Sequence, residues 1–171
     1  MNGWIRAGVA MALLSVAACS NSANDANSVD LNTPPGGTAG AGTGLVTDQT
    51  SIAYFQQAIG DRVLFAVDQS TLSDAAQAVL TAQADWMVAN PSYSVVIEGH
   101  ADEQGTREYN LALGARRATA AQEFLISRGV SADRLRVVSF GKERPIEICS
   151  EETCYAKNRR AVTVLSSDLT G

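Results

Sequence analysis

Residues 96–105 read VIEGHADEQG and residues 110–118 read NLALGARRA, which indicates a strand, a polar turn that ends in glycine, and a helix. Asp102 lies in the turn, and Arg117 lies about two turns into the helix. The strand and the helix would hold this carboxylate and this guanidinium near each other. Such a pair suits a zwitterion, which is a ligand with both an ammonium and a carboxylate group.

Strands and helices alternate in the chain on either side of this segment. Ser73 is a suitable N-cap for one helix, and Gly129 is a suitable residue to end the next. The predicted elements are helices at 52–59, 73–89 and 108–128 and strands at 63–67, 94–98, 135–139 and 161–165. After the short first helix, the order is β-α-β-α-β-β. This order predicts an α/β (α+β) fold with helices on one face of a mixed sheet, without defining the strand order.

Apolar residues at helical spacing predict which side of each helix faces the core. The inward positions are expected to be Ile52, Phe55 and Ile59 in the first helix, Ala76, Val79, Leu80, Ala84 and Met87 in the second, and Leu111, Ala118, Ala121 and Leu125 in the third.

The N-terminus is typical of a secretory signal over residues 1–18. Arg6 supplies a positive charge, and an apolar run of about 12 residues follows, which is shorter than the ~20 residues of a membrane-spanning helix. The run ends in VAAC at 16–19, which resembles a bacterial lipobox with cleavage before Cys19. Three acyl chains on Cys19 would anchor the protein stably in a membrane. An ordinary signal peptide with a chance cysteine is the alternative. By resemblance to Gram-negative lipoproteins, Ser20 implies the outer membrane.

Residues 19–50 are predicted to be the lipidated N-terminus and a flexible linker, and residues 51–171 a single domain. The linker is rich in Ser, Asn, Asp, Thr, Gly and Ala, with PPGG at 34–37. About 30 such residues span ~30 Å on average, enough for a tether. The net charge is −5, or −6 once cleavage removes Arg6. This acidic balance argues against nucleic acid as a partner and against a general polybasic membrane patch.

Two cysteines remain if Cys19 carries lipid. Cys149 and Cys154 are separated by four residues, a spacing that allows a small disulfide loop. An oxidising periplasm would favour that bond. A metal pair is the alternative, but it lacks further ligands because His100 is the one histidine of the chain and is distant in sequence. We therefore predict a Cys149–Cys154 disulfide and no metal site.

Three motifs resemble the OmpA-like peptidoglycan-binding domain family. They are VLFAVDQS at 63–70, the strand, turn and helix of 96–118, and YAKNRRAV at 155–162. The resemblance covers roughly residues 52–166. It implies a two-layer α/β sandwich that is not an enzyme, needs no cofactor, and binds the diaminopimelate-containing stem peptide of peptidoglycan.

Together with the lipoprotein signal, the resemblance implies an outer-membrane lipoprotein of the Tol-Pal system whose domain faces the periplasm. Its partners would be peptidoglycan, TolB and other components of that system. It would tether the outer membrane to the cell wall and support envelope integrity and constriction during division. The alternatives are an OmpA-like envelope lipoprotein outside this system, or a peptidoglycan hydrolase.

Five residues match positions of the family's binding site. Asp102 and Arg117 match the residues that hold diaminopimelate, and Asn110 matches a supporting polar contact. Asp68 would lie at the rim of the pocket, and Arg159 would lie beside it. Four of them also have a plainer explanation. Asp102 and Asp68 could be ordinary turn residues, Arg117 a surface arginine or a structural partner of Asp102, and Arg159 a support for the fold.

His100 is the residue that an enzyme hypothesis would use. It has no visible nucleophile as a partner, because the chain lacks a G-x-S-x-G elbow, and an H-E-x-x-H metal motif is also missing. We therefore expect His100 to be structural or to line the pocket. Arg116 projects about 100° away from Arg117 and is expected to lie on the surface.

Overall fold

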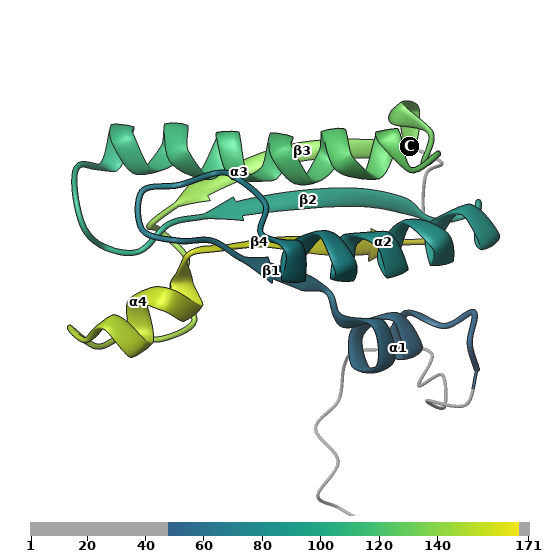
Figure 1. The fold of residues 1–171 in the computed structure, drawn as a ribbon, viewed down its shortest axis with the longest axis horizontal. Coiled ribbons are helices and arrows are strands. Elements are labelled where there is room, and N and C mark those ends of the chain that lie inside the picture. Colours follow the sequence, from purple (N-terminus) through teal and green to yellow (C-terminus); the bar gives the residue numbers. More distant parts are fainter. Residues whose placement is uncertain (1–47, 168–171) are drawn as a thin grey trace, which may run out of the picture. The chain divides into compact units, whose positions relative to one another are not determined.

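A computed structural model describes residues 48–167 and shows a four-stranded mixed sheet. The strands are β1 (Arg62–Leu64), β2 (Ser94–His100), β3 (Leu135–Gly141) and β4 (Arg160–Ser166), in the spatial order β1-β4-β2-β3 (Figure 1). β2 and β3 are parallel, and β4 runs antiparallel to both β1 and β2. The predicted mixed sheet is confirmed. The C-terminal strand lies between the first two strands, an arrangement that the order of elements along the chain does not reveal.

Two long helices cover one face of this sheet, α2 (Asp74–Ala89) and α3 (Arg107–Ser127), as Figure 1 shows. Ser73 caps α2 as predicted, because its hydroxyl accepts a hydrogen bond from the Ala76 N–H at 3.2 Å. Gly129 follows α3 with a φ of 98°, a backbone conformation that glycine adopts without strain. The two-layer α/β sandwich is therefore confirmed.

The remaining helical segments are short. α1 (Ile52–Tyr54) continues into a π-helical turn over Phe55–Gly60, and a 3₁₀ turn at Ala132–Arg134 leads into β3. α4 (Glu152–Asn158) precedes β4 and was not predicted from the sequence. Cys149 and Cys154 form the predicted disulfide across the start of α4, with a Cα–Cα distance of 5.9 Å.

The core lies between the helices and the sheet. Its fully buried members include Leu80 and Met87 of α2, Leu125 of α3 and Ile97 of β2. Most of the predicted inward positions are buried or pack against this core. Leu111 is the exception in α3, because it is only partly buried and Leu113 is buried in its place. The buried face of α3 begins with Asn110, which is polar. A prediction from the spacing of apolar residues therefore places the start of the buried face part of a turn away from its true position.

β2 and α3 approach each other closely at a pair of glycines. A Cβ atom added to Gly99 would lie 1.8 Å from the main-chain oxygen of Gly114. A Cβ atom added to Gly114 would lie 2.5 Å from the Ser139 hydroxyl on β3. The absence of side chains at both positions therefore allows the N-terminal half of α3 to lie against the end of β2, where the predicted site begins.

The predicted signal peptide, Cys19 and most of the predicted linker lie outside residues 48–167. Within the described range, no helix is both long and apolar enough to span a membrane.

Candidate functional site

A hollow of about 240 Å³ lies at the ends of β1 and β2 and beside the first turns of α3. Its lining residues are Val67, Asp68, Asp102, Gln104, Gly105, Tyr109, Asn110 and Leu113. The structure thus brings together three of the predicted site residues, Asp68, Asp102 and Asn110. The other two, Arg117 and Arg159, lie behind the lining rather than in it.

Asp102 lies just beyond the C-terminal end of β2 and is 7% exposed. Its Oδ2 accepts a hydrogen bond from Arg159 Nη1 at 3.1 Å, and its Oδ1 accepts one from the Gln104 N–H at 3.3 Å. The charge partner of Asp102 is therefore Arg159, and residues 48–167 contain no Arg117–Asp102 ion pair within 4.0 Å. One carboxylate of the pocket is thus charged, held in place and still reachable from the hollow.

Arg117 is completely buried, and its guanidinium bonds main-chain oxygens. Nε donates to Gln69 O at 2.8 Å, Nη1 to His100 O at 2.9 Å and Nη2 to Ala66 O at 3.2 Å. Burial lowers the pKa of Arg117 to about 10, and the nearby charge of Asp102 opposes that shift. Arg117 therefore ties the segment after β1 to the end of β2. These three bonds do not use all the N–H groups of the guanidinium, so some remain for a ligand. The ligand role of Arg117 stays a prediction.

Asp68 and Asn110 both line the hollow. Asp68 is exposed and has a φ of 57°, uncommon for a residue other than glycine, and its Oδ1 accepts a hydrogen bond from the Tyr109 hydroxyl. Asn110 is buried and donates from Nδ2 to Gln104 O at 2.7 Å. Tyr109 and Gln104 were not predicted from the sequence. Tyr109 is 43% exposed, so the spacing of buried positions along α3 gave no signal for it.

Arg159 precedes β4 and is 5% exposed. It donates from Nε to Phe65 O at 3.2 Å, and its two Nη atoms contact Asp102 and Glu152. Burial opposes the charge, but hydrogen bonds to Glu152 and Asp102 outweigh it and raise the pKa of Arg159. Arg159 therefore both braces the end of β1 and neighbours the pocket. Glu152 was missed from the sequence because α4, which carries it, was missed.

Charges of both signs surround the hollow, and they include the ammonium of Lys142, which donates to Gly105 O at 2.7 Å. Asp68, Asp102 and Glu152 contribute carboxylates, and Arg117 and Arg159 contribute guanidinium groups. A hollow with two lining carboxylates at its surface can accept an ammonium group from a ligand.

His100 is buried on the far side of β2 and does not line the hollow. Its ring stacks on Phe140 with centroids 5.5 Å apart, and neither ring nitrogen has a hydrogen-bond partner among the residues that the structure describes. Burial, together with the charges of Arg160 and Arg144, lowers its pKa to about 4. His100 is thus a neutral, packed side chain. Across residues 48–167, no cluster of His, Cys, Asp and Glu could hold a metal ion.

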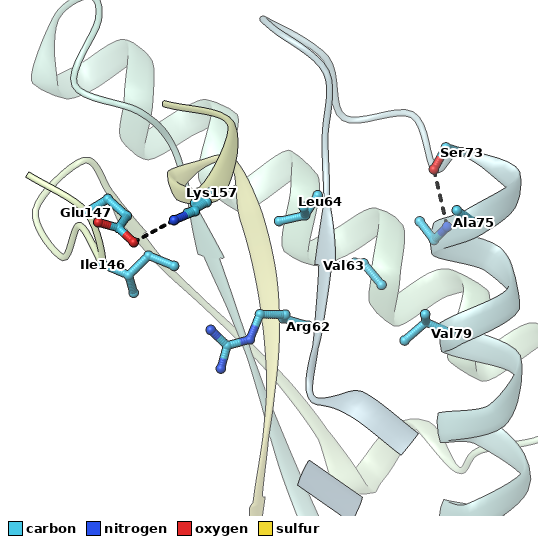
Figure 2. A pocket seen from close by; sticks show the side chains of 10 residues that line it. Arg62, Val63, Leu64, Ser73, Ala75, Val79, Ile146, Glu147 and Lys157 are labelled. Carbon is cyan, nitrogen blue, oxygen red and sulfur yellow. Dashed lines mark hydrogen bonds and ion pairs between the residues drawn. The ribbon is translucent and has the colours of Figure 1, made fainter. Parts of the chain in front are cut away.

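A second and larger hollow, about 580 Å³, lies beside the edge strand β1 and the start of α2 (Figure 2). Its lining is mostly apolar, including Val63, Leu64 and Val79, and an ion pair of Lys157 and Glu147 at 2.8 Å lies at one side. It contains none of the predicted site residues. Size alone therefore does not identify the site, whereas the smaller hollow is lined by the predicted site residues Asp68, Asp102 and Asn110.

Comparison with known proteins gives a consistent set of relatives. The sequence profile of the OmpA family matches residues 64–159. The chain is 47% identical over 164 residues to the peptidoglycan-associated lipoprotein of Brucella melitensis, covering 94% of this chain and 93% of that protein. It is 39% identical over 154 residues to the peptidoglycan-associated lipoprotein of Haemophilus influenzae, covering 90% and 92%.

Solved structures agree with the fold. The crystal structure of the peptidoglycan-associated lipoprotein from Burkholderia pseudomallei matches with a TM-score of 0.63 and 36% identity, over 71% of this chain and 98% of that one. The C-terminal domain of Helicobacter pylori MotB matches with a TM-score of 0.60 over 64% of this chain and 86% of that one. Its identity is 21%, so it supports the fold alone.

Proposed function

The chain belongs to the OmpA family and, within it, to the peptidoglycan-associated lipoproteins, and from this we propose that it binds peptidoglycan non-covalently and links it to the outer membrane. The chain is not an enzyme, as this family membership indicates. The proposed activity is therefore recognition and retention of the cell wall.

The observation that carries the proposal is the partly buried carboxylate of Asp102 at the wall of a small polar hollow. A charged group at 7% exposure is stabilised only where it has partners, and Arg159 and the Gln104 N–H supply them. An ammonium group that enters the hollow would meet Asp102 with Asp68 beside it. We infer that the side-chain ammonium of diaminopimelate in the stem peptide is this group.

The carboxylate of the same ligand residue needs donors. Arg117 is buried near enough to Asp102 to interact with its charge, and it keeps N–H groups beyond those bonded to Ala66, Gln69 and His100. We propose that these groups stabilise the ligand carboxylate, while Asn110 holds the turn that carries Gln104. In this scheme Asp102 and Asp68 contact the ligand, and Arg159 acts through Asp102.

The cellular role extends this proposal. We propose that Cys19 is lipidated, that the lipid anchors the chain in the outer membrane, and that residues 20–50 act as the tether. The relatives named peptidoglycan-associated lipoprotein support this assignment, since each aligns with about nine tenths of the chain. We further propose that the protein acts in the Tol-Pal system, with TolB as a partner, during envelope constriction in cell division.

The test is a pull-down of the purified protein with isolated peptidoglycan sacculi. Asp102→Ala removes at least one charge-assisted contact of about 1.5–3 kcal/mol, so binding should weaken roughly 10- to 100-fold. Arg136→Ala is the matched control, because Arg136 is exposed on β3 and does not line the hollow. Circular dichroism must first show that both variants are folded. The site assignment fails if folded Asp102→Ala binds sacculi as well as the wild type.

A further inference from the structure

Two carboxylates from distant parts of the chain share the guanidinium of Arg159. Asp102 Oδ2 lies 3.1 Å from Nη1, and Glu152 contacts Nη2 through Oε1 and lies 3.5 Å from Nη1 through Oε2. Arg159 is buried, Asp102 faces the hollow, and Glu152 is mostly exposed on α4. Arg159 therefore divides its positive charge between a carboxylate in the site and one outside it.

Glu152 lies inside the loop that the disulfide closes. Cys149 and Cys154 flank it, and α4 begins at Glu152 itself. The main-chain oxygen of Glu151 accepts hydrogen bonds from the N–H groups of Cys154 and Tyr155, both at 3.0 Å. The disulfide thus fixes the first turn of α4 and, with it, the point from which the Glu152 side chain reaches Arg159.

We propose that Glu152, held by the Cys149–Cys154 disulfide, is a positioning residue of the binding site that leaves the charge of Asp102 available to a cationic ligand group. This inference rests on the proposed function. Without Glu152, both Nη groups of Arg159 would be free to turn to Asp102, as arginine pairs with carboxylates through two parallel bonds. Asp102 would then be neutralised within the protein, and an incoming ammonium would gain less by binding it.

The charge balance of the site leads to the same expectation. Glu152 supplies one of three carboxylates that lie near Arg159 and Arg117, so its loss makes the site less negative by one charge. Because the Glu152 side chain is 65% exposed, salt should screen its long-range effect on a ligand. The contribution to binding should therefore be moderate and depend on ionic strength.

Glu152→Gln and Glu151→Gln form a matched pair of variants. Both remove one negative charge from the start of α4, but Glu151 makes no capping hydrogen bond with its side chain. With purified sacculi in about 20 mM salt, Glu152→Gln should bind about 3- to 10-fold more weakly than the wild type, and the difference should shrink to less than about twofold at 0.5 M salt. Glu151→Gln should bind as the wild type does. The thermal unfolding midpoints of both variants should stay close to the wild-type value.

The role of the disulfide is tested by the full chain with Cys149→Ser and Cys154→Ser. This variant should bind as weakly as Glu152→Gln at low salt, and adding Glu152→Gln to it should weaken binding little further. Equal binding by Glu152→Gln and the wild type, or equal losses in Glu152→Gln and Glu151→Gln, would overturn the proposal. Wild-type binding by the serine variant would overturn the part played by the disulfide. If the wild type itself fails to bind sacculi, the proposed function falls and this inference with it.

Discussion

Arg117 on α3 and Arg159 before β4 are both buried near Asp102, but their partners differ in kind. Arg117 bonds the main-chain oxygens of Ala66, Gln69 and His100, whereas Arg159 bonds the carboxylates of Asp102 and Glu152 together with one main-chain oxygen. A guanidinium among carbonyl groups holds the main chain in place. A guanidinium among carboxylates sets the charge that a ligand meets.

The difference shows that burial of a cation does not by itself identify a ligand contact. Arg117 was predicted to bind a ligand carboxylate, and in the structure it also forms three hydrogen bonds to main-chain oxygens. Arg159 was predicted with less emphasis, yet it is the direct partner of Asp102. The two arginines should therefore respond differently to substitution, and the effects on folding separate them first.

The largest effect is expected for Arg117→Ala. The variant removes three hydrogen bonds to main-chain oxygens, of which the bond to His100 O is buried, and it opens a cavity, so the free energy of unfolding should fall by about 4 kcal/mol. Arg117→Lys should recover only part of this loss, because one ammonium cannot replace the spread of three nitrogen atoms. Urea unfolding followed by circular dichroism measures both. A loss below about 1 kcal/mol for Arg117→Ala, comparable to that of exposed Arg116→Ala, would show that the bonds to the main chain matter little.

A smaller effect is expected for Arg159→Met. The substitution leaves Asp102 charged and nearly buried without its partner, which should cost about 3 kcal/mol of unfolding free energy. Adding Asp102→Asn removes the unpaired charge, so the double variant should be more stable than Arg159→Met alone. Arg117→Ala should gain less from the same addition, because the hydrogen-bond partners that it loses are neutral main-chain oxygens. Equal responses of the two arginine variants to Asp102→Asn would remove the distinction between them.

The third prediction concerns His100, a buried base that has no hydrogen-bond partner among the described residues and whose Nε2 lies 3.5 Å from the Glu98 carboxylate. Its pKa in the folded protein is about 4, below the ordinary value of 6.5, so the unfolded chain binds the proton more readily. The stabilisation from keeping His100 neutral is complete above about pH 6.5 and is lost as the pH falls toward 4, up to roughly 3 kcal/mol. Urea unfolding at pH 7.5 and 4.5 should show a smaller loss for His100→Gln than for the wild type. An equal loss in both proteins would assign the acid sensitivity to other groups.

Features of the fold that depend on neighbouring residues were predicted well. The cap at Ser73, the end of α3 at Gly129 and the loop closed by Cys149 and Cys154 each depend on residues a few positions apart. The three motifs placed Asp68, Asp102 and Asn110 in one site, and these residues do line one hollow. Local spacing and family resemblance were sufficient for these features.

The partners of the buried charges could not be predicted in the same way. Arg117 bonds oxygens 17 to 51 residues away in sequence, and every residue type carries such an oxygen, so no residue pattern marks them. The pairing of Asp102 with Arg159 spans 57 residues and depends on β4 lying between β1 and β2. α4 was missed because its apolar pattern is weak, although Glu152 in its first turn and Lys157 in its last are the charges that a helix favours at its ends.

The contact of Gly99 with Gly114 has a consequence for how the site can vary between related proteins. These two glycines allow α3 and β2 to approach as closely as their main chains permit. Along α3, the candidate site residue Asn110 precedes Gly114 and Arg117 follows it. A single methyl group at Gly99 would have to drive the helix outward, since the nearest atoms are main chain and cannot rotate away. The distance between α3 and β2, and with it the spacing of the candidate site residues that follow β2 and lie on α3, is therefore set by two positions that carry only hydrogen atoms.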